Sequence, residues 1–286
     1  ILSSGKLPVA AGRFNLRDGM NTSINQKRVG YRLPEYYGIE SKRVEEAVDR
    51  FINKVGGNTT DIQISLMKNG DIIYTNQKSR AIELSMVKGY ISTLPIISYI
   101  ASHNYISLED FVNKHLNINK ESIYYNKLVS DVIMNRVFEP HESDLYPKYR
   151  ESNYDIQKEI IEKISNTSLS RLITVNILEA IGMIGTYIDN NGKLFSTSED
   201  ISRFIYVVQS LGKYGNCQIM DDKTLSVFNK FSHYYTKDDN GTIIFNNSDY
   251  NSAIVIIVNG PKSKEVSIEA ENLRKELSFI IDNIEY

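Results

Sequence analysis

The order in which the hydrophobic period changes along the chain restricts its fold more than any other feature. Residues 61–76 alternate apolar and polar side chains on both sides of Asn69-Gly70, a dipeptide typical of a tight two-residue turn, so this stretch predicts a β-hairpin. Helical patterns then run from residue 85 to 211, and strand-like patterns return in residues 232–236, 241–246 and 252–259. Two early strands and three late strands form one antiparallel sheet only if the helical block is an insertion beside it.

Amphipathic helical patterns flank this arrangement at both ends. Residues 41–55 place Val44, Val48 and Phe51 on one helical face, and residues 265–284 carry a second long apolar stripe. Each stripe needs an apolar surface to cover. We therefore expect an α+β fold, with a five-stranded antiparallel sheet covered by the terminal helices and an inserted all-helical subdomain.

The domain organisation follows from the same patterns. Residues 1–40 are polar and interrupted by glycine and proline, and we interpret them as a linker or wrapping arm. Residues 41–286 are expected to form one domain, in which 41–84 and 232–286 make the α/β part and 85–231 the helical part. The helical patterns are 85–103, with a bend at Pro95, then 107–116, 123–137, 153–165, 168–181 and 198–211.

Charge and cysteine content exclude several classes of function. The 33 basic and 35 acidic residues leave a net charge of -2, so we expect no nucleic-acid partner. The single cysteine, Cys217, excludes an internal disulfide and a cysteine-based zinc cluster, and the four histidines show no metal-ligand spacing. We expect neither a metal nor another cofactor.

Composition also bears on where the protein works. No apolar run approaches the roughly 20 residues needed to cross a bilayer. The chain begins with Ile1-Leu2, so its start gives no information about a signal. Near-absence of cysteine and abundant Asn, Ile, Lys and Tyr favour a protein of a low-GC bacterium and suit an extracytoplasmic location, at the cell surface or secreted.

A serine three positions before a lysine occurs three times, at Ser3, Ser65 and Ser85. Spacing alone does not separate these copies. Only Ser85, with Lys88, comes directly after the predicted hairpin and opens a helical pattern. On a helix, residues three apart share a face, so Lys88 can reach the Ser85 hydroxyl. A serine hydroxyl needs such a neighbouring base to act as a nucleophile.

This layout resembles the serine β-lactamase and penicillin-binding protein superfamily, in which a Ser-x-x-Lys motif opens a helix after the first hairpin. Residues 104–110 resemble the turn that follows that helix, with Asn104 in place of the usual glycine. Residues 152–186 are similar to a pattern of class C β-lactamases and D-alanyl-D-alanine carboxypeptidases. Residues 192–200 resemble the next segment of the same proteins, and Ser198 is expected to cap the helix that follows.

The resemblance implies a role for each motif position. Ser85 would be the acylated nucleophile, Lys88 its base, and Tyr149, found by counting back along the pattern, a second proton-transfer group. Partial burial would lower the pKa of Lys88 toward a useful range. Backbone NH groups of Ser85 and of the third strand would form an oxyanion hole. The implied reaction cleaves or transfers a D-alanyl amide or ester of a cell-wall polymer through an acyl-enzyme.

Two motifs depart from the family pattern. The second motif, Tyr-x-Asn, is represented by Tyr149-Arg150-Glu151, with a carboxylate at the position of the amide. Tyr146-Pro147-Lys148 and Ser130-Asp131-Val132 are alternative placements. The third motif, Lys-Thr-Gly or His-Thr-Gly, is represented by His233-Tyr234-Tyr235, and a ring at the glycine position would alter or block the substrate slot. Glu151, His233 and Tyr235 are the expected substrate-binding residues.

These departures leave several functions open. The expected partner is a cell-wall peptide or a teichoic-acid-type polymer, with a β-lactam as a further ligand and an envelope protein as an alternative partner. A catalytically inactive domain retained for binding is the main rival, and the decayed motifs favour it. A sensor acylated by β-lactam without turnover and an esterase on small acyl esters are two further alternatives. Clustered tyrosines fit either a groove or ordinary packing: Tyr124, Tyr125, Tyr146, Tyr149 and Tyr154.

Overall fold

The structure is a computed structural model that describes residues 27–59, 61–76, 80–84, 87–134, 147–232 and 235–283. These residues divide into two compact units. The helical unit comprises residues 88–177 and 218–232, and the sheet unit comprises the rest.

A six-stranded mixed sheet forms the centre of the sheet unit. Its strands, in spatial order, are β1 (Gly30–Tyr31), β3 (Asp71–Thr75), β2 (Asp61–Lys68), β11 (Ser252–Asn259), β10 (Ile243–Asn247) and β9 (Tyr235–Lys237). The last five pair in antiparallel fashion, as predicted, whereas β1 pairs with β3 in parallel. The predicted sheet of five strands, all antiparallel, is therefore one strand short, because a strand from the segment expected to be an arm pairs with the outer edge of β3.

The predicted hairpin is confirmed at Asn69-Gly70. Both residues have positive φ, 49° and 77°, and Lys68 lies opposite Asp71 across the turn. Asparagine and glycine tolerate this left-handed backbone better than other residues. A Cβ atom on Gly70 would also collide with the ring of Tyr206.

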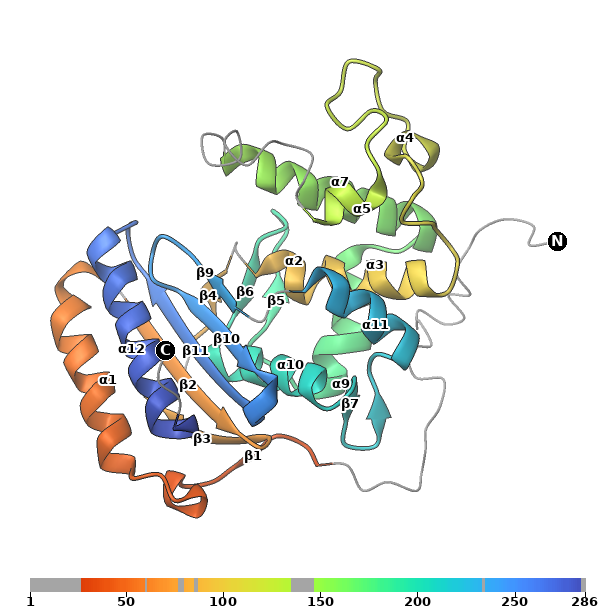
Figure 1. The fold of residues 1–286 in the computed structure, drawn as a ribbon. Coiled ribbons are helices and arrows are strands. Elements are labelled where there is room, and N and C mark those ends of the chain that lie inside the picture. The colour runs from red at the N-terminus through yellow and green to blue at the C-terminus, as the bar shows by residue number, and fades with distance from the viewer. Residues whose placement is uncertain are drawn as a thin grey trace. The chain divides into compact units, whose positions relative to one another are not determined.

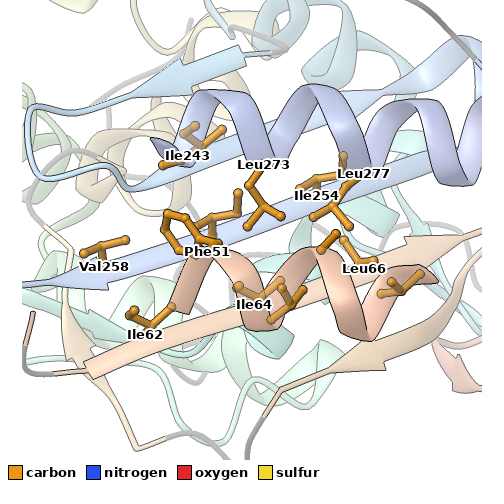
Figure 2. Packing of buried hydrophobic residues seen from close by; sticks show 14 of the residues in the cluster. Phe51, Ile62, Ile64, Leu66, Ile243, Ile254, Val258, Leu273 and Leu277 are labelled. Carbon is orange, nitrogen blue, oxygen red and sulfur yellow. The ribbon is translucent and has the colours of Figure 1, made fainter. Parts of the chain in front are cut away.

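Two helices cover one face of this sheet, α1 (Ser41–Val55) and α12 (Lys264–Asp282) (Figure 1). Their apolar stripes pack on alternate residues of β2, β10 and β11, and these residues form one buried cluster. Figure 2 shows Phe51 of α1 and Leu273 and Leu277 of α12 beside Ile64 and Ile254 of the sheet, all within this cluster. The two terminal helices therefore bury their apolar faces against the sheet, as their hydrophobic periodicity predicts.

Helix α10 (Ser198–Gln209) packs against β2 and β11. Ser202 of α10 shares a buried hydrogen bond with Ser65 of β2, 3.0 Å between their Oγ atoms. The helix is capped by Thr197, whose side chain accepts from the NH of Asp200, so the expectation that Ser198 is the cap is wrong. Because α10 packs on the sheet, residues 178–217 group with the sheet unit.

Short elements complete the sheet unit. Strands β4 (Ile82–Glu83), β6 (Leu194–Ser196) and β5 (Tyr187–Ile188) form a small antiparallel sheet in that order. The remaining short elements are β7 (Lys213–Tyr214), which pairs with β8 (Cys217–Gln218), the 3-10 helices η2 (Pro34–Tyr37), η3 (Gly56–Asn58) and η5 (Ser248–Tyr250), and α9 (Glu179–Ile181).

The helical unit is built around α3 (Thr93–Ser102), which contacts α7 (Pro147–Ser165), α8 (Leu169–Ile173) and α11 (Asp222–Phe231). The other elements of this region are α2 (Lys88–Ile91), α4 (Val112–His115), α5 (Val129–Ile133) and the π-helical segment η4 (Thr174–Leu178). Most of these helices are shorter than the patterns predicted, and α11 was not predicted.

The predicted helix 85–103 is two helices in the structure, with the break at Ser92 between α2 and α3. Pro95 explains the break, because it has no NH to donate to the carbonyl of Ile91 and its ring crowds that carbonyl. The interruption therefore lies one helical turn before the proline rather than at the proline itself.

Asparagine takes the left-handed backbone conformation at several turns. Asn104, which stands where the family pattern has glycine, has φ of 61°. Asn166 follows the sequence IIEKIS, a position where that pattern also has glycine, and its φ is 53°. Since asparagine tolerates positive φ, both turns keep the backbone path that glycine would allow.

Candidate functional site

The residues predicted to form the site are described to different extents. Ser85 and His233 lie outside the described residues. Tyr149 and Glu151 belong to α7, where the description covers their backbone only. Lys88 and Tyr235 are fully described, so the geometry of the candidate site is built from their surroundings.

Lys88 is the first residue of α2 and is partly buried. Its Nζ atom lies 3.6 Å from the centroid of the Tyr154 ring, so the amine sits on the face of that ring. An ammonium group is attracted by the electron-rich face of an aromatic ring, whereas a neutral amine gains much less from this position. The contact therefore favours the charged form of Lys88.

Tyr154 is buried on α7, with 7% of its surface exposed. Its hydroxyl is 3.4 Å from the Oγ of Ser92, at the break between α2 and α3. Burial raises the pKa of Tyr154 to about 12; the Ser92 hydrogen bond acts in the opposite direction, and the nearby carboxylates of Asp155 and Glu162 add to the rise. The Tyr154 hydroxyl therefore keeps its proton at neutral pH.

Helix α7 is held in place by a buried polar contact beside Tyr154. Thr93 of α3 donates to Oε1 of Gln157 at 2.6 Å, and Nε2 of Gln157 donates to the carbonyl of Val132 in α5 at 3.1 Å. Gln157 thus ties α7 to two neighbouring helices. Because Gln157 is one helical turn after Tyr154, these bonds fix the face of α7 that carries the ring.

The tyrosine that contacts Lys88 differs from the one the family spacing indicated. Counting along the motif gave Tyr149, whereas Tyr154 was considered only as one of five clustered tyrosines. One available signal was the helical spacing of Tyr154, Gln157 and Ile161, which places all three on the buried side of α7. That spacing predicts a buried face, but it does not indicate that the face meets Lys88.

Tyr235 lies on the edge strand β9, opposite Phe245 of β10. Its hydroxyl donates to Oε2 of Glu271 in α12 at 2.8 Å, and the guanidinium carbon of Arg274 lies 5.5 Å from its ring centroid. Burial, together with the hydrogen bond to the Glu271 carboxylate, raises the pKa of the Tyr235 hydroxyl. The sequence suggested that this ring fills the substrate slot, whereas in the structure it packs against α12.

Another copy of the serine-lysine spacing, Ser65 and Lys68, does not form a nucleophile and base. Both residues lie on strand β2, where residues three apart point to opposite faces of the sheet. Ser65 is fully buried against Ser202 of α10, while Nζ of Lys68 bonds Asp282 of α12 at 2.7 Å. Strand geometry therefore excludes this pair.

Metal binding and membrane insertion find no support in the part of the chain that the structure describes. Within it, no group of three or more His, Cys, Asp and Glu side chains is arranged to hold a metal ion. None of its helices combines the length and the apolar character that crossing a membrane requires.

Known structures share this arrangement of sheet and helices. A D-alanine carboxypeptidase AmpC from Burkholderia cenocepacia matches 85% of this chain and 99% of its own, with a TM-score of 0.61 and 12% identity. A penicillin-binding protein homologue from Caulobacter crescentus matches 85% of this chain and 99% of its own, with a TM-score of 0.64 and 7% identity. Another such homologue, from Pyrococcus abyssi, matches 86% of this chain and 81% of its own, with a TM-score of 0.58 and 14% identity.

The chain has the fold of the serine β-lactamase and penicillin-binding protein superfamily. The resemblance stated from the sequence is confirmed at this level. No protein-family model matches the sequence, and neither does any curated protein. In this β-lactamase-like fold, the edge strand β9 begins at Tyr235, the last residue of the predicted third motif, and α2, with Lys88, follows the hairpin and β4 along the chain.

Proposed function

We propose that the protein is an extracytoplasmic serine acyl-transfer hydrolase that acts on D-alanyl amide or ester groups of a cell-wall polymer. One observation carries this proposal: in a β-lactamase-like fold, Lys88 opens the first helix after the hairpin, with Ser85 three residues earlier in the sequence. The proposal takes its substrate class from the family resemblance. A cell-wall peptide and a teichoic-acid-type polymer both carry such groups.

The proposed reaction has two steps. The Ser85 oxygen attacks the substrate carbonyl and passes its proton to a base, the bond to the leaving amine or alcohol breaks, and the leaving group takes up a proton. Water then attacks the acyl-serine ester and releases the acid, or a second amine accepts the acyl group. Lys88 and Tyr149 are the proposed proton-transfer groups, since a serine hydroxyl is a weak nucleophile without one.

The position of the Tyr235 ring leaves the opposite side of β9 available for the proposed substrate. Its ring is held on α12 by Glu271 and Arg274, so it does not project from the opposite side of the strand. Backbone groups along an edge strand are free to pair with an extended substrate. A tyrosine at the motif position is therefore compatible with binding, and Glu151 and His233 remain the proposed neighbours of the substrate.

A catalytically inactive envelope domain is the second candidate, and the contact between Lys88 and Tyr154 favours it. An amine held as an ammonium ion cannot accept a proton from serine. In that case the fold would serve to bind a cell-wall polymer or an envelope protein.

Covalent labelling distinguishes the two candidates. The protein is incubated separately with a fluorescent penicillin and a fluorophosphonate, and its intact mass is measured. We expect one adduct with at least one probe, lost in Ser85→Ala and kept in Ser3→Ala, a control that removes a serine with the same spacing to a lysine. No adduct with either probe on folded protein would exclude the activated serine and leave the binding domain.

A further inference from the structure

The contact between Lys88 and Tyr154 has the geometry of a strong cation–π interaction. The Nζ atom lies 3.6 Å from the ring centroid, well inside the roughly 6 Å within which such contacts are effective. Tyr154 is buried, so little water competes for the amine on that side. The ring itself has little freedom, because Gln157 fixes the same face of α7 to α3 and α5.

The elements packed around α2 and Tyr154 differ in the charge that they carry. Helix α3, which packs against α2, carries no charged side chain between Thr93 and Ser102. On α11, Phe228 packs on the ring of Tyr90 in α2. On α7, the carboxylates of Asp155 and Glu162 place negative potential near Tyr154.

We infer that Tyr154 is a positioning residue that holds Lys88 as an ammonium ion on its ring face. While its amine lies on the ring as an ammonium ion, Lys88 supplies a positive charge, and it takes up the proton of Ser85 only in the small fraction of molecules in which the amine is neutral. For Lys88 to act as a base, its amine must leave the ring or lose its proton at higher pH. The consequence for Ser85 rests on the proposed function, whereas the state of Lys88 does not.

The charge state of Lys88 is measured directly by amine labelling across a pH series. Acetic anhydride reacts with neutral amines, so the pH of half-maximal acetylation of the Lys88 peptide, read by mass spectrometry, reports its protonation. We expect this midpoint to fall by roughly one pH unit in Tyr154→Leu, which lacks the ring, and to stay near the wild-type value in Tyr154→Phe, which keeps it.

Two controls separate this effect from changed accessibility or folding. Lys42, whose side chain is 84% exposed on α1, should keep the same midpoint in every variant. The variants are compared by the pH midpoint of Lys88 acetylation and not by its extent. Greater exposure of Lys88 alone would raise the extent of acetylation but would not shift the midpoint. Tyr154→Met serves beside Tyr154→Leu, and the variant whose circular dichroism matches wild type is used. A midpoint unchanged without the ring, or one that falls equally in Tyr154→Phe, would overturn the inference.

A second readout links the contact to Ser85. The rate of fluorophosphonate labelling is measured at pH 7 in the wild type and the Tyr154 variants. We expect several-fold faster labelling of Ser85 when the ring is absent, because more of Lys88 is then neutral. If Ser85 is unreactive in every variant, the proposed function fails, and the Lys88 midpoints still decide whether Tyr154 sets the charge.

Discussion

Asp282, in the last turn of α12, forms an ion pair with Lys68 of β2, with Oδ1 2.7 Å from Nζ. The carboxylate is fully buried, and its other oxygen accepts hydrogen bonds from Asn247 and Ser252. These contacts tie the end of α12 to β2, β10 and β11. Lys68, Asn247 and Ser252 all belong to the sheet unit, as Asp282 does.

Replacement of Asp282 by alanine is expected to lower the free energy of unfolding by about 3–5 kcal/mol, because it leaves the Lys68 ammonium largely buried without its partner. Urea unfolding measures the change. Glu46→Ala, which removes a surface pair with Lys42 at 3.8 Å, is the control and should change stability by less than about 1 kcal/mol. Equal losses of unfolding free energy in the two variants would show that the buried ion pair stabilises the fold no more than the surface pair does.

Gly70→Ala is expected to destabilise the hairpin by about 2–4 kcal/mol, since the new methyl group strains a positive φ and collides with the Tyr206 ring. Gly38→Ala is the matched control. Gly38 has φ of 73°, but a Cβ there meets no atom within 4 Å, so only the backbone strain of about 1–2 kcal/mol applies. Thermal unfolding of both variants tests whether Gly70→Ala is the more costly change.

Asp200 predicts a specific pH dependence. Burial raises its pKa, although hydrogen bonds from Thr186 and Arg203 partly offset the rise. A carboxyl whose pKa is higher in the folded state contributes stability below its unfolded pKa of about 3.9, and this contribution is lost as pH rises through the folded value. The stability of Asp200→Asn relative to wild type should therefore increase as pH rises from about 4.

This comparison is made by urea unfolding of the wild type and Asp200→Asn at several pH values between 4 and 7. Other titrating groups are common to both proteins, so their contributions cancel in the difference. A difference that stays constant over this range, or that falls with pH, would contradict the raised pKa.

Asp221 links two helices of the helical unit. Its Oδ1 atom accepts from the NH of Thr224 as the cap of α11, and Oδ2 lies 3.1 Å from Nε2 of His103, next to the end of α3. Asp221→Asn keeps a capping oxygen and loses the charge, so we expect a loss below about 1 kcal/mol. Asp221→Ala loses both and should cost about 1–2 kcal/mol more. Thermal unfolding should rank the three proteins in this order.

Short-range sequence patterns predicted the elements that depend on turn residues and on hydrophobic periodicity. The Asn69-Gly70 hairpin, α1, α12 and the three late strands all lie where turn chemistry and hydrophobic period indicated. Strand β1 was missed because Gly30 and Tyr31 pair only through the edge of β3, a contact set by tertiary structure. The break at Ser92 was placed too late because a proline affects the carbonyl four residues before it.

The candidate site was predictable in part. The position of Lys88 at the start of a helix after the hairpin follows from sequence spacing and resemblance. The tyrosine that contacts Lys88 could not be predicted in the same way. Motif counting identifies a tyrosine by its distance along the chain, whereas the contact depends on which face of α7 is buried. Tyr235 shows the same limit: the motif gives the residue, but the strand decides which way its ring points.

The left-handed asparagines at 104 and 166 have a consequence for how this sequence compares with those of proteins that share its fold. A turn that requires positive φ accepts either glycine or asparagine. Selection for the backbone conformation therefore permits either residue at that position. Exchanges of glycine for asparagine at such turns lower sequence identity without changing the fold. The solved structures that share the fold of this chain are 7–14% identical to it. At Asn104 and Asn166 the backbone dihedral angle is therefore a better guide to the shared fold than the residue type is.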